Sequence, residues 1–573
     1  MYRELTVAAV LFGIVQGVIL NIAFAYIALK LGFSLGGSTI AAILGYVFLR
    51  GLLRKGTIVE NNINQTIASG INSAGTGVVF VLPALFLLNG QGNLILSIWP
   101  LLLAGIAGAI LGVVVIIPLR KQLIEIERLR FPTGVAVATI IRSGAAGIDK
   151  VKLLGIGFLI SAIWKLLLIS GWLDSPGWLE NEELNLSFGL IPAYFAPALS
   201  LSILNFAAGL LSGRAGLPFL LGGIVAWWVI SPISVTAGWT PINLDNQALV
   251  DFIHSQMLRP LGIGVLIGAA LMEVMVNFQA IKSAIYSLVA ASRTASRLKA
   301  GVDEMPFWVL LAGGGVAMLF FFIAAWSTPG VSITQASLVA LLGTLWLGLA
   351  GLIVAQCTGL TDISPVSGIA LISVTMMMMV LNGNIAAAMI VTLAAAIAIG
   401  QSADMMQDLK KGFMLGSRPL IQQLVQFGTS WLGPILSFVV IYVLWSSGAG
   451  GSHGFGPDSS LPAPQATALM SIIEAIQNNT VPSDKYILGT IIGILLGTAP
   501  VASLGVLAGL AMYLPFSITL GYGLGCLTQI VISQRKGKSF IENKLVPLAA
   551  GLIIGEALMG VGYAVYEIIQ STG

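Results

Sequence analysis

Charge is the scarcest property of this sequence. Charged residues make up 9% of its 573 residues, hydrophobic residues make up 57%, and the mean hydropathy is +0.97. A soluble domain carries about 25% charged residues, so this composition cannot cover a surface that faces water. The apolar runs are about 20 residues long, which spans a bilayer as a helix, and they lack the alternation of membrane strands. The sequence therefore predicts an all-α, polytopic transmembrane helical bundle.

Cysteine and histidine are also rare. Cys357 and Cys526 lie in apolar surroundings, and neither His254 nor His453 has a second ligand at metal-binding spacing. These patterns exclude a disulfide framework and a zinc site. We therefore expect no metal site and no cofactor.

Motifs of enzymes and of ATP-driven pumps are missing as well. The sequence has no HExxH pattern and no histidine within an apolar run, so we expect no catalytic residues and no enzyme activity. It has no GxxxxGK[ST] segment, the phosphate-binding loop of many ATPases. Its polar groups are scattered and unique, whereas channels use rings of identical groups. These absences favour a carrier that is driven by an ion gradient.

The apolar runs predict about 14 to 16 spans. Loops rich in lysine and arginine face the cytoplasm, and such residues follow several runs. They include Arg50, Arg54, Lys55, Arg120, Lys121, Arg142, Lys150, Arg293, Lys410, Lys411, Arg535 and Lys536. Together with Arg3, they predict a multi-pass protein of the cell (inner) membrane with a cytoplasmic N-terminus. The acidic loop 174–183 is expected outside.

Two consecutive basic loops flank residues 132–143, so we expect this element to be re-entrant or broken. Residues 514–533 raise the same expectation, because both elements begin at a proline, and residues 67–70 resemble residues 397–400. Transporters are often built from internal repeats. We therefore expect a duplicated architecture, with an N-terminal half at 1–300 and a C-terminal half at 301–573 that includes an outer loop near 446–485.

The segment VENNINQTIASGINSAGTGVVFVLP, residues 59–83, is unusually polar for an apolar region. Amide side chains offer donors and acceptors without charge, and the small residues allow a helix to break or to approach a neighbour closely. We predict that this segment lines a polar cavity and supplies substrate-binding side chains. These are Asn61, Asn62, Asn64, Gln65 and Asn72. The alternative is a set of interhelical amide bonds that hold the bundle together.

Asp362 is the one charged residue between Met305 and Ala403. It lies in the sequence TGLTDISP, where glycine and proline favour an interrupted helix. Irregular backbone at membrane depth survives only where protein or water satisfies it, so Thr361 and Asp362 are candidates for a substrate or ion site. An N-cap at the membrane interface is the alternative reading of Asp362.

Three further acidic positions lie in apolar helices. Glu273 is followed one turn later by Asn277, Glu556 stands among small residues, and Asp404 follows Gln401. A carboxylate facing lipid would be costly, so each is expected to face a cavity or to be protonated. The alternatives are structural hydrogen bonds for Glu273 and Glu556.

Asp408, Lys410 and Lys411 continue the polar series beyond Asp404, and a solvated helix end explains these three residues well. Lys165 is read as a packing or snorkelling residue.

Six segments resemble signatures of the oligopeptide transporter (OPT) family, in the family's order. They are ENNINQTIAS (60–69), LRFPTG (129–134), TGLTDISP (358–365), DMMQDLK (404–410), YLP (513–515) and GEALMG (555–560). The resemblance is closest to prokaryotic members, a branch related to the plant yellow-stripe-like metal-chelate carriers. It implies a secondary active transporter with about 16 spans derived by duplication, which moves oligopeptides or metal chelates, usually inward and with protons.

The sequence also departs from the family pattern. Thr133 stands where the family often has Glu, Ser364 stands where it often has Asn before the proline, and Asn72 lies near a position that is often acidic. Because of these departures, a particular substrate or coupling residue cannot be inferred from the family.

The leading hypothesis is a proton-coupled symporter that imports oligopeptides or peptide-like metal chelates. Its site would lie between interrupted elements at 60–83, 358–366 and 397–408, with Gln401 and Asp362 among the substrate-binding residues. The proton-coupling candidates are Glu273, Asp362, Asp404 and Glu556. The alternative is a sodium-coupled or uncoupled carrier for another small polar solute. The expected partners are the solute, H⁺ and the lipid bilayer, with no nucleic acid, and a homodimer is one option for the assembly.

Overall fold

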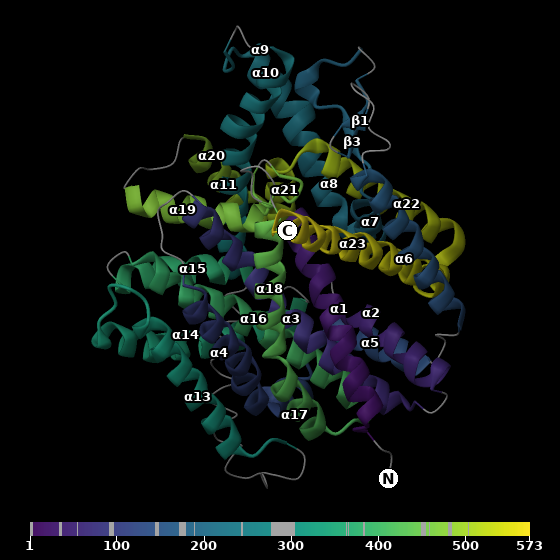
Figure 1. Cartoon of the computed structure of the whole chain (residues 1–573), viewed down its shortest axis with the longest axis vertical. Coiled ribbons are helices and arrows are strands. Elements are labelled where there is room, and N and C mark those ends of the chain that lie inside the picture. Colours follow the sequence, from purple (N-terminus) through teal and green to yellow (C-terminus); the bar gives the residue numbers. More distant parts are fainter. Residues whose placement is uncertain are drawn as a thin grey trace. The chain divides into compact units, whose positions relative to one another are not determined.

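The structure is a computed structural model (Figure 1), and it describes most of the chain. The described residues are 4–33, 37–53, 56–90, 97–143, 148–170, 179–180, 182–187, 190–241, 245–276, 304–361, 364, 366–381, 384–447, 454–457, 459–478, 484–501 and 503–572. Asp362, Asn277 and His453 lie outside them.

Internal contacts divide the chain into two compact units. Unit 1 comprises residues 1–28, 36–148 and 277–445, and unit 2 comprises residues 29–35, 149–276 and 446–573. Each unit therefore takes segments from both halves of the sequence. The division into duplicated halves at 1–300 and 301–573 stays a prediction.

Unit 1 is built around α16 (Ile385–Leu415), which packs against α3, α4, α5, α14 and α15. Nearly every residue of α16 is buried, as expected for a helix that is apolar on all sides. The other helices of this unit are α1 (Val7–Leu31), α2 (Gly37–Tyr46), α3 (Ile58–Gly90), α4 (Ile98–Ile116), α5 (Pro132–Ser143), α13 (Phe307–Trp326), α14 (Ile333–Thr361), α15 (Val366–Val380), α17 (Pro419–Thr429) and α18 (Leu432–Ser446).

The expectation of interrupted elements at 60–83 and 397–408 is wrong, because α3 and α16 run through these segments as continuous helices. The start of α3 has a capping box: the backbone N–H of Thr57 donates to Glu60 and the N–H of Glu60 donates to the Thr57 hydroxyl, at 2.7 and 3.1 Å. The small residues serve close packing instead of a break. A methyl group on Gly77 would lie 2.5 Å from the backbone nitrogen of Ile397.

This close approach gives a stability prediction. Gly77→Ala should lower the free energy of unfolding by about 1–3 kcal/mol, the usual cost of overpacking, because the backbone of α16 cannot yield as a side chain could. Thermal unfolding of the purified protein in detergent would measure it. Gly315→Ala is the matched control, since a methyl group there meets nothing within 4 Å. Equal midpoints for the two variants would contradict the proposed packing role.

Two other predicted interruptions are present in unit 1. Helix α5 has 12 residues, or about 18 Å, which is too short for a hydrocarbon core of about 30 Å. Helix α14 ends at Thr361 and α15 begins at Val366. The two breaks meet, because the backbone N–H of Phe131 donates to the carbonyl of Gly359 at 3.0 Å. Two family-like segments, 129–134 and 358–361, are thus brought together.

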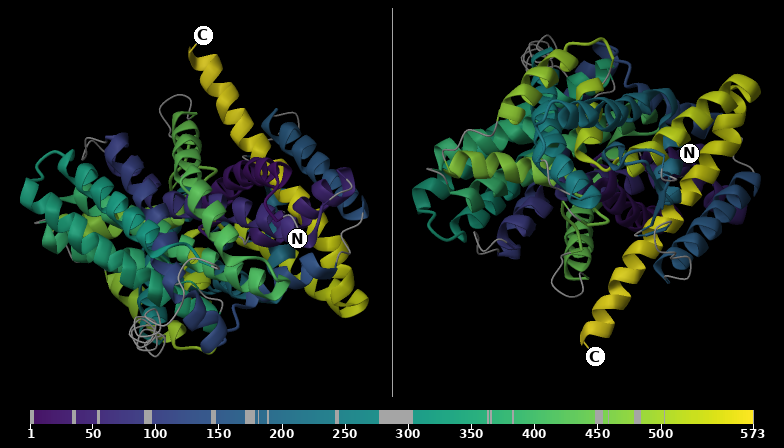
Figure 2. Two further views of the ribbon diagram at one scale, coloured as in Figure 1. Left: turned by 90° about the horizontal axis from the view of Figure 1, so that it is seen from below. Right: turned by 90° about the horizontal axis from the view of Figure 1, so that it is seen from above.

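Unit 2 contains α6 (Ile148–Ile169), α7 (Ile203–Ser212), α8 (Leu217–Ile224), α9 (Ser231–Thr236), α10 (Asn246–Ile253), α11 (Arg259–Val276), α19 (Pro464–Asn478), α20 (Asp484–Gly497), α21 (Leu504–Tyr513), α22 (Phe516–Phe540) and α23 (Val546–Thr572). Helix α11 packs against α20 and α21, and α7 packs against α22 and α23. The doubt about 514–533 is not supported, because α22 runs from Phe516 to a kink at Gly537, and the 21 residues before the kink are long enough to span. Figure 2 shows α23 as one long helix.

A small antiparallel sheet also belongs to unit 2. Strands β1 (Leu179–Glu180), β2 (Glu183–Asn185) and β3 (Ala198–Ser200) pair in this order, with Glu183 opposite Ser200. It is a minor addition to a helical protein. In the described part of the chain, 11 helical stretches are long and apolar enough to cross a membrane, and shorter apolar helices accompany them.

Candidate functional site

The polar face of α3 is largely occupied by bonds to neighbouring segments of unit 1. The Nδ2 atoms of Asn61, Asn62 and Asn64 donate to the Ala42 carbonyl, the Ser417 hydroxyl and the Ala9 carbonyl at 3.0, 2.9 and 3.0 Å. These three side chains are buried. Their contacts support the alternative reading of interhelical amide bonds, in which the amides fix α3 against its neighbours.

Gln65 and Gln401 differ from these asparagines. Both side chains are fully buried, and neither amide oxygen nor amide nitrogen has a hydrogen-bond partner among the described residues. The side-chain oxygens of Asn61, Asn62 and Asn72 also have no hydrogen-bond partner among the described residues, although the Nδ2 atoms of Asn61 and Asn62 are bonded. A buried polar atom without a partner costs about 1–3 kcal/mol, so each calls for an explanation such as water or a ligand. Gln65 and Gln401 lie on α3 and α16, two helices packed against each other (Figure 1).

Asp404 is the acidic group nearest to these amides along α16. The Ser69 hydroxyl donates to its Oδ1 atom, and the Ser38 and Ser69 hydroxyls are 2.9 Å apart. Gln426 Nε2 donates to Asp404 Oδ2 at 3.3 Å. Asp404 therefore joins α2, α3, α16 and α17 through polar side chains alone.

One turn later, Asp408 is paired with Lys411. The Lys411 Nζ atom is 2.6 Å from Asp408 Oδ1, and the Lys411 side chain is 0% exposed. The reading of Asp408 and Lys411 as a solvated helix end is therefore wrong. Gln422 Nε2 contacts both the Thr66 hydroxyl and the Asp408 carbonyl, at 3.1 and 2.9 Å. We refer to Asp404, Asp408 and Lys411 as the α16 charge triad.

The triad is unbalanced when all three groups are ionised. Two carboxylates and one ammonium leave one net negative charge at a place where all three side chains are buried. An uncompensated buried charge is costly. Because Lys411 contacts Asp408, Asp404 is the carboxylate that has no cation at contact distance among the described residues. The arrangement can therefore take up one monovalent cation, and Asp404 is the group that would receive it.

The sequence indicated Asp404 but not the polar residues that contact the α16 charge triad. Ser38, Thr66, Ser69, Gln422 and Gln426 are ordinary residues by type, and only tertiary packing brings them to α16. One signal was present: Gln422 and Gln426 lie one turn apart on α17, so a buried face of that short helix carries amides.

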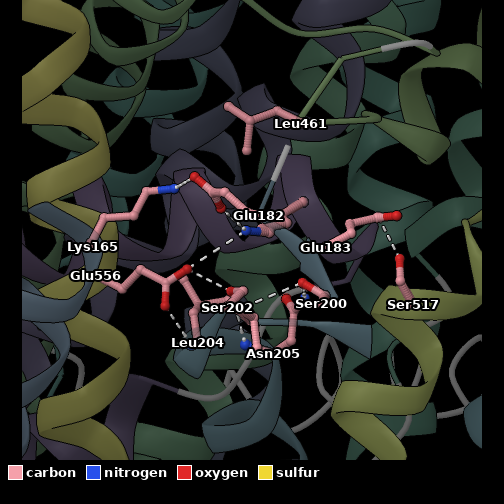
Figure 3. A network of polar contacts seen from close by, with 12 residues as sticks. Lys165, Glu182, Glu183, Ser200, Ser202, Leu204, Asn205, Leu461, Ser517 and Glu556 are labelled. Carbon is pink, nitrogen blue, oxygen red and sulfur yellow. Dashed lines mark hydrogen bonds and ion pairs between the residues drawn. The ribbon is translucent and has the colours of Figure 1, made fainter. Parts of the chain in front are cut away.

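Glu556 lies in a second polar network, in unit 2 (Figure 3). The Ser202 hydroxyl donates to its Oε1 atom, and the backbone N–H of Leu204 donates to Oε2 at 2.7 Å. Lys30 Nζ is 3.6 Å from Oε1. Glu556 thus satisfies the first turn of α7, whose N-cap is Ser202. These contacts agree with the alternative reading of Glu556 as a structural hydrogen-bonding group.

Lys165 pairs with Glu182 in the same network, and Lys30 is 3.9 Å from Glu182. Lys165 is buried, so of the two roles expected for it, packing or snorkelling, snorkelling is wrong. Burial by itself would raise the pKa of Glu182, but the charges of Lys30 and Lys165 outweigh burial and lower its pKa below the ordinary value.

The remaining predicted residues are divided between the two units. Glu273 lies on α11 in unit 2 and is hydrogen-bonded with Ser503. Thr361 is the last residue of α14, in unit 1. Asp362 lies outside the described residues. Unit 1 thus contains the predicted amides together with Asp404, whereas unit 2 contains Glu273 and Glu556.

Comparisons with known proteins match the whole length of the chain. The family model described as "OPT oligopeptide transporter protein" matches residues 4–566. A Haemophilus influenzae protein named as an oligopeptide transporter is 28% identical, over 94% of this chain and 91% of its own. A rice (Oryza sativa subsp. japonica) protein named as a metal-nicotianamine transporter, YSL6, is 24% identical over 97% and 91%. A second rice protein of that name, YSL5, is 25% identical over 96% and 89%. The chain belongs to the oligopeptide transporter family and is therefore a multi-pass membrane transporter.

Proposed function

We propose that this transporter is a proton-coupled symporter, that it imports oligopeptides or peptide-like metal chelates, and that Asp404 carries the coupling proton. The observation that carries the proposal is the α16 charge triad, in which two buried carboxylates are accompanied by one ammonium group, and of the two carboxylates this group contacts Asp408 alone. Protonation of Asp404 makes the triad electrically neutral. A neutral triad can change its surroundings during the transport cycle at a lower electrostatic cost than a charged one.

The solute class follows from the amides beside the triad. Gln65, Asn72 and Gln401 present buried amide atoms without partners among the described residues. Peptide bonds offer the complementary donor and acceptor groups. The relatives named for oligopeptides and for metal-nicotianamine agree with a solute rich in amide or carboxylate groups. We assign solute contacts to these three residues, and structural contacts to Asn61, Asn62 and Asn64.

The basic loops support a cytoplasmic N-terminus in the cell membrane. In this orientation the imported solute and the proton enter from the side of the membrane opposite the N-terminus and move into the cytoplasm. Thr361 remains a candidate for the site because it ends α14, and Asp362 remains a candidate on its sequence alone. Glu273 remains the second candidate for coupling.

Uptake by proteoliposomes tests the proposal. The purified protein would face an inward proton gradient in the presence of mixed di- to hexapeptides and of iron and nickel chelates of nicotianamine, with mass spectrometry of the vesicle contents. We expect selective accumulation that collapses when a protonophore is added. Accumulation under a sodium gradient alone would show that the coupling ion is Na⁺ and not H⁺. The oxygens of Asp404, Ser38 and Ser69 are also suitable ligands for Na⁺. Entry without accumulation under either gradient would contradict coupling.

A further inference from the structure

Two buried lysines of unit 2 face one carboxylate. Lys30 comes from the end of α1 and Lys165 comes from α6, and both side chains are only 4% exposed. Glu182 lies within ion-pair distance of both. Lysine is almost never buried without a charged partner, so this pair needs an anion at that position.

Glu182 is more exposed than the two lysines that it contacts. Its side chain is 22% exposed, whereas each lysine is nearly inaccessible. It precedes β2 in a short turn, where its backbone has a φ of 64°, a conformation that only glycine adopts readily. The lysines are carried by two long helices, whereas Glu182 is carried by a sheet of two- and three-residue strands. The carboxylate is thus the least firmly held member of the cluster.

The charges of the cluster show what could replace Glu182. Glu556 has its own donors, Ser202 and Leu204 N–H, and balances Lys30 at 3.6 Å. Glu182 balances the remaining ammonium of Lys165. Burial raises the pKa of the neighbouring Glu183, which accepts a bond from Ser517 instead of a lysine. If Glu182 swings out, one buried positive charge is left without a partner, and one carboxylate restores neutrality.

We propose that Lys30 and Lys165 form a binding site for a carboxylate group of the solute, and that Glu182 occupies this site until the solute displaces it. The carboxylate belongs to a peptide C-terminus or to a carboxylate-bearing chelate, which share this chemistry. No covalent step is involved, since one carboxylate replaces another at the same ammonium groups. This inference rests on the proposed function for the source of the carboxylate, but the site itself can be tested without transport.

Chemical rescue provides the first test. Glu182→Ala should lower the midpoint of thermal unfolding in detergent, because it leaves a buried ammonium group without a partner. Trialanine should restore the midpoint by a few degrees in a saturable manner, whereas trialanine amide at matched ionic strength should not. Wild type should respond to trialanine more weakly than Glu182→Ala, because Glu182 competes for the same ammonium groups, and it should not respond to the amide. Asp251→Ala, which removes an exposed carboxylate of the same unit, is the control and should show no rescue.

The double variant Lys165→Met/Glu182→Ala removes the ammonium group together with its partner. It should be more stable than Glu182→Ala alone and should lose the response to trialanine. Equal rescue of Glu182→Ala by trialanine and its amide would overturn the proposal, as would rescue that persists in the double variant. Both results would leave the proposed function untouched.

Transport kinetics provide the second test and separate the two sources of the carboxylate. For a peptide substrate found by the uptake panel, amidation of the C-terminus should raise KM about tenfold or more, as expected for the loss of a charge-assisted contact. In Lys165→Met/Glu182→Gln, the free and amidated peptides should have similar KM values. If only nickel–nicotianamine is taken up, its KM should rise in that variant, and the carboxylate then comes from a chelate. Unchanged KM values in every arm would refute the site although transport itself is established.

Discussion

Asp404→Asn is expected to yield a transporter that still binds and exchanges its solute but no longer accumulates it under a proton gradient. Asparagine has nearly the shape of aspartate and can accept the bond from Ser69, but it cannot ionise. It therefore holds the α16 charge triad permanently in its neutral state. For one coupled proton, an inward gradient of one pH unit can support about tenfold accumulation, since it is worth about 1.4 kcal/mol. The variant should reach equal concentrations on both sides.

The measurement combines two assays on the same vesicles: accumulation under the proton gradient, and exchange of labelled for unlabelled solute without a gradient. Glu273→Gln is the second arm, because the sequence also points to Glu273 as a coupling group. Asp251→Asn, at an exposed position, should behave like wild type in both assays. Loss of accumulation in Glu273→Gln but not in Asp404→Asn would move the coupling role to Glu273.

Lys411→Met is expected to destabilise the protein by about 3–5 kcal/mol, the usual cost of removing one partner from a buried ion pair. Lys411 is fully buried, and its ammonium group lies 2.6 Å from Asp408. Without it, two carboxylates of α16 face each other across one helical turn with no cation at contact distance. The expected observations are a lower thermal midpoint in detergent and a smaller yield of monodisperse protein.

Two further variants test whether the loss of stability comes from the unbalanced charge at Asp408. Lys410→Met changes the adjacent, partly exposed lysine of α16 and should alter the midpoint only slightly. Asp408→Asn/Lys411→Met removes both members of the ion pair and should recover a large part of the lost stability, because no unbalanced charge remains at Asp408. A Lys411→Met protein as stable as wild type would show that the ion pair is not needed to balance the triad.

The general architecture could be predicted from composition, because a chain with so few charges can bury its apolar runs only as membrane helices. The sequence pattern of small and polar residues does not distinguish a broken helix from a tightly packed one. Glycine and other small residues serve both purposes, and in α3 the choice depends on the approach of α16, which is remote in sequence. Proline is a second, local signal for the start of α5 at Pro132 and for the end of α14 at Thr361, but it is not decisive, since Pro83 lies inside the continuous helix α3.

Buried polar positions could be recognised from the sequence where the residue type is unusual in an apolar helix. Gln401, Asp404 and Glu556 stand out in this way and are buried. Asp404 and Glu556 are hydrogen-bonded to neighbouring segments, whereas the Gln401 amide has no partner among the described residues. The function of Asn61, Asn62 and Asn64 could not be predicted, because an amide looks the same whether it binds a neighbouring carbonyl or a solute. The lysine cluster was missed for another reason. Glu182 lies in a short acidic segment that reads as a solvated loop, and only the small sheet brings it to Lys165.

The way unit 1 is assembled has a consequence for the synthesis of the protein. Helix α3 ends at Gly90 and its partner α16 begins at Ile385, so about 300 residues are translated between them. At about 5–20 residues per second, the ribosome needs ~15–60 s to produce this stretch. During that time Asn62 lacks its partner Ser417, and Ser69 lacks its partner Asp404. The nascent chain therefore depends on the insertion machinery, or on provisional contacts with earlier helices, to shelter this polar surface from lipid until the second half of the chain arrives.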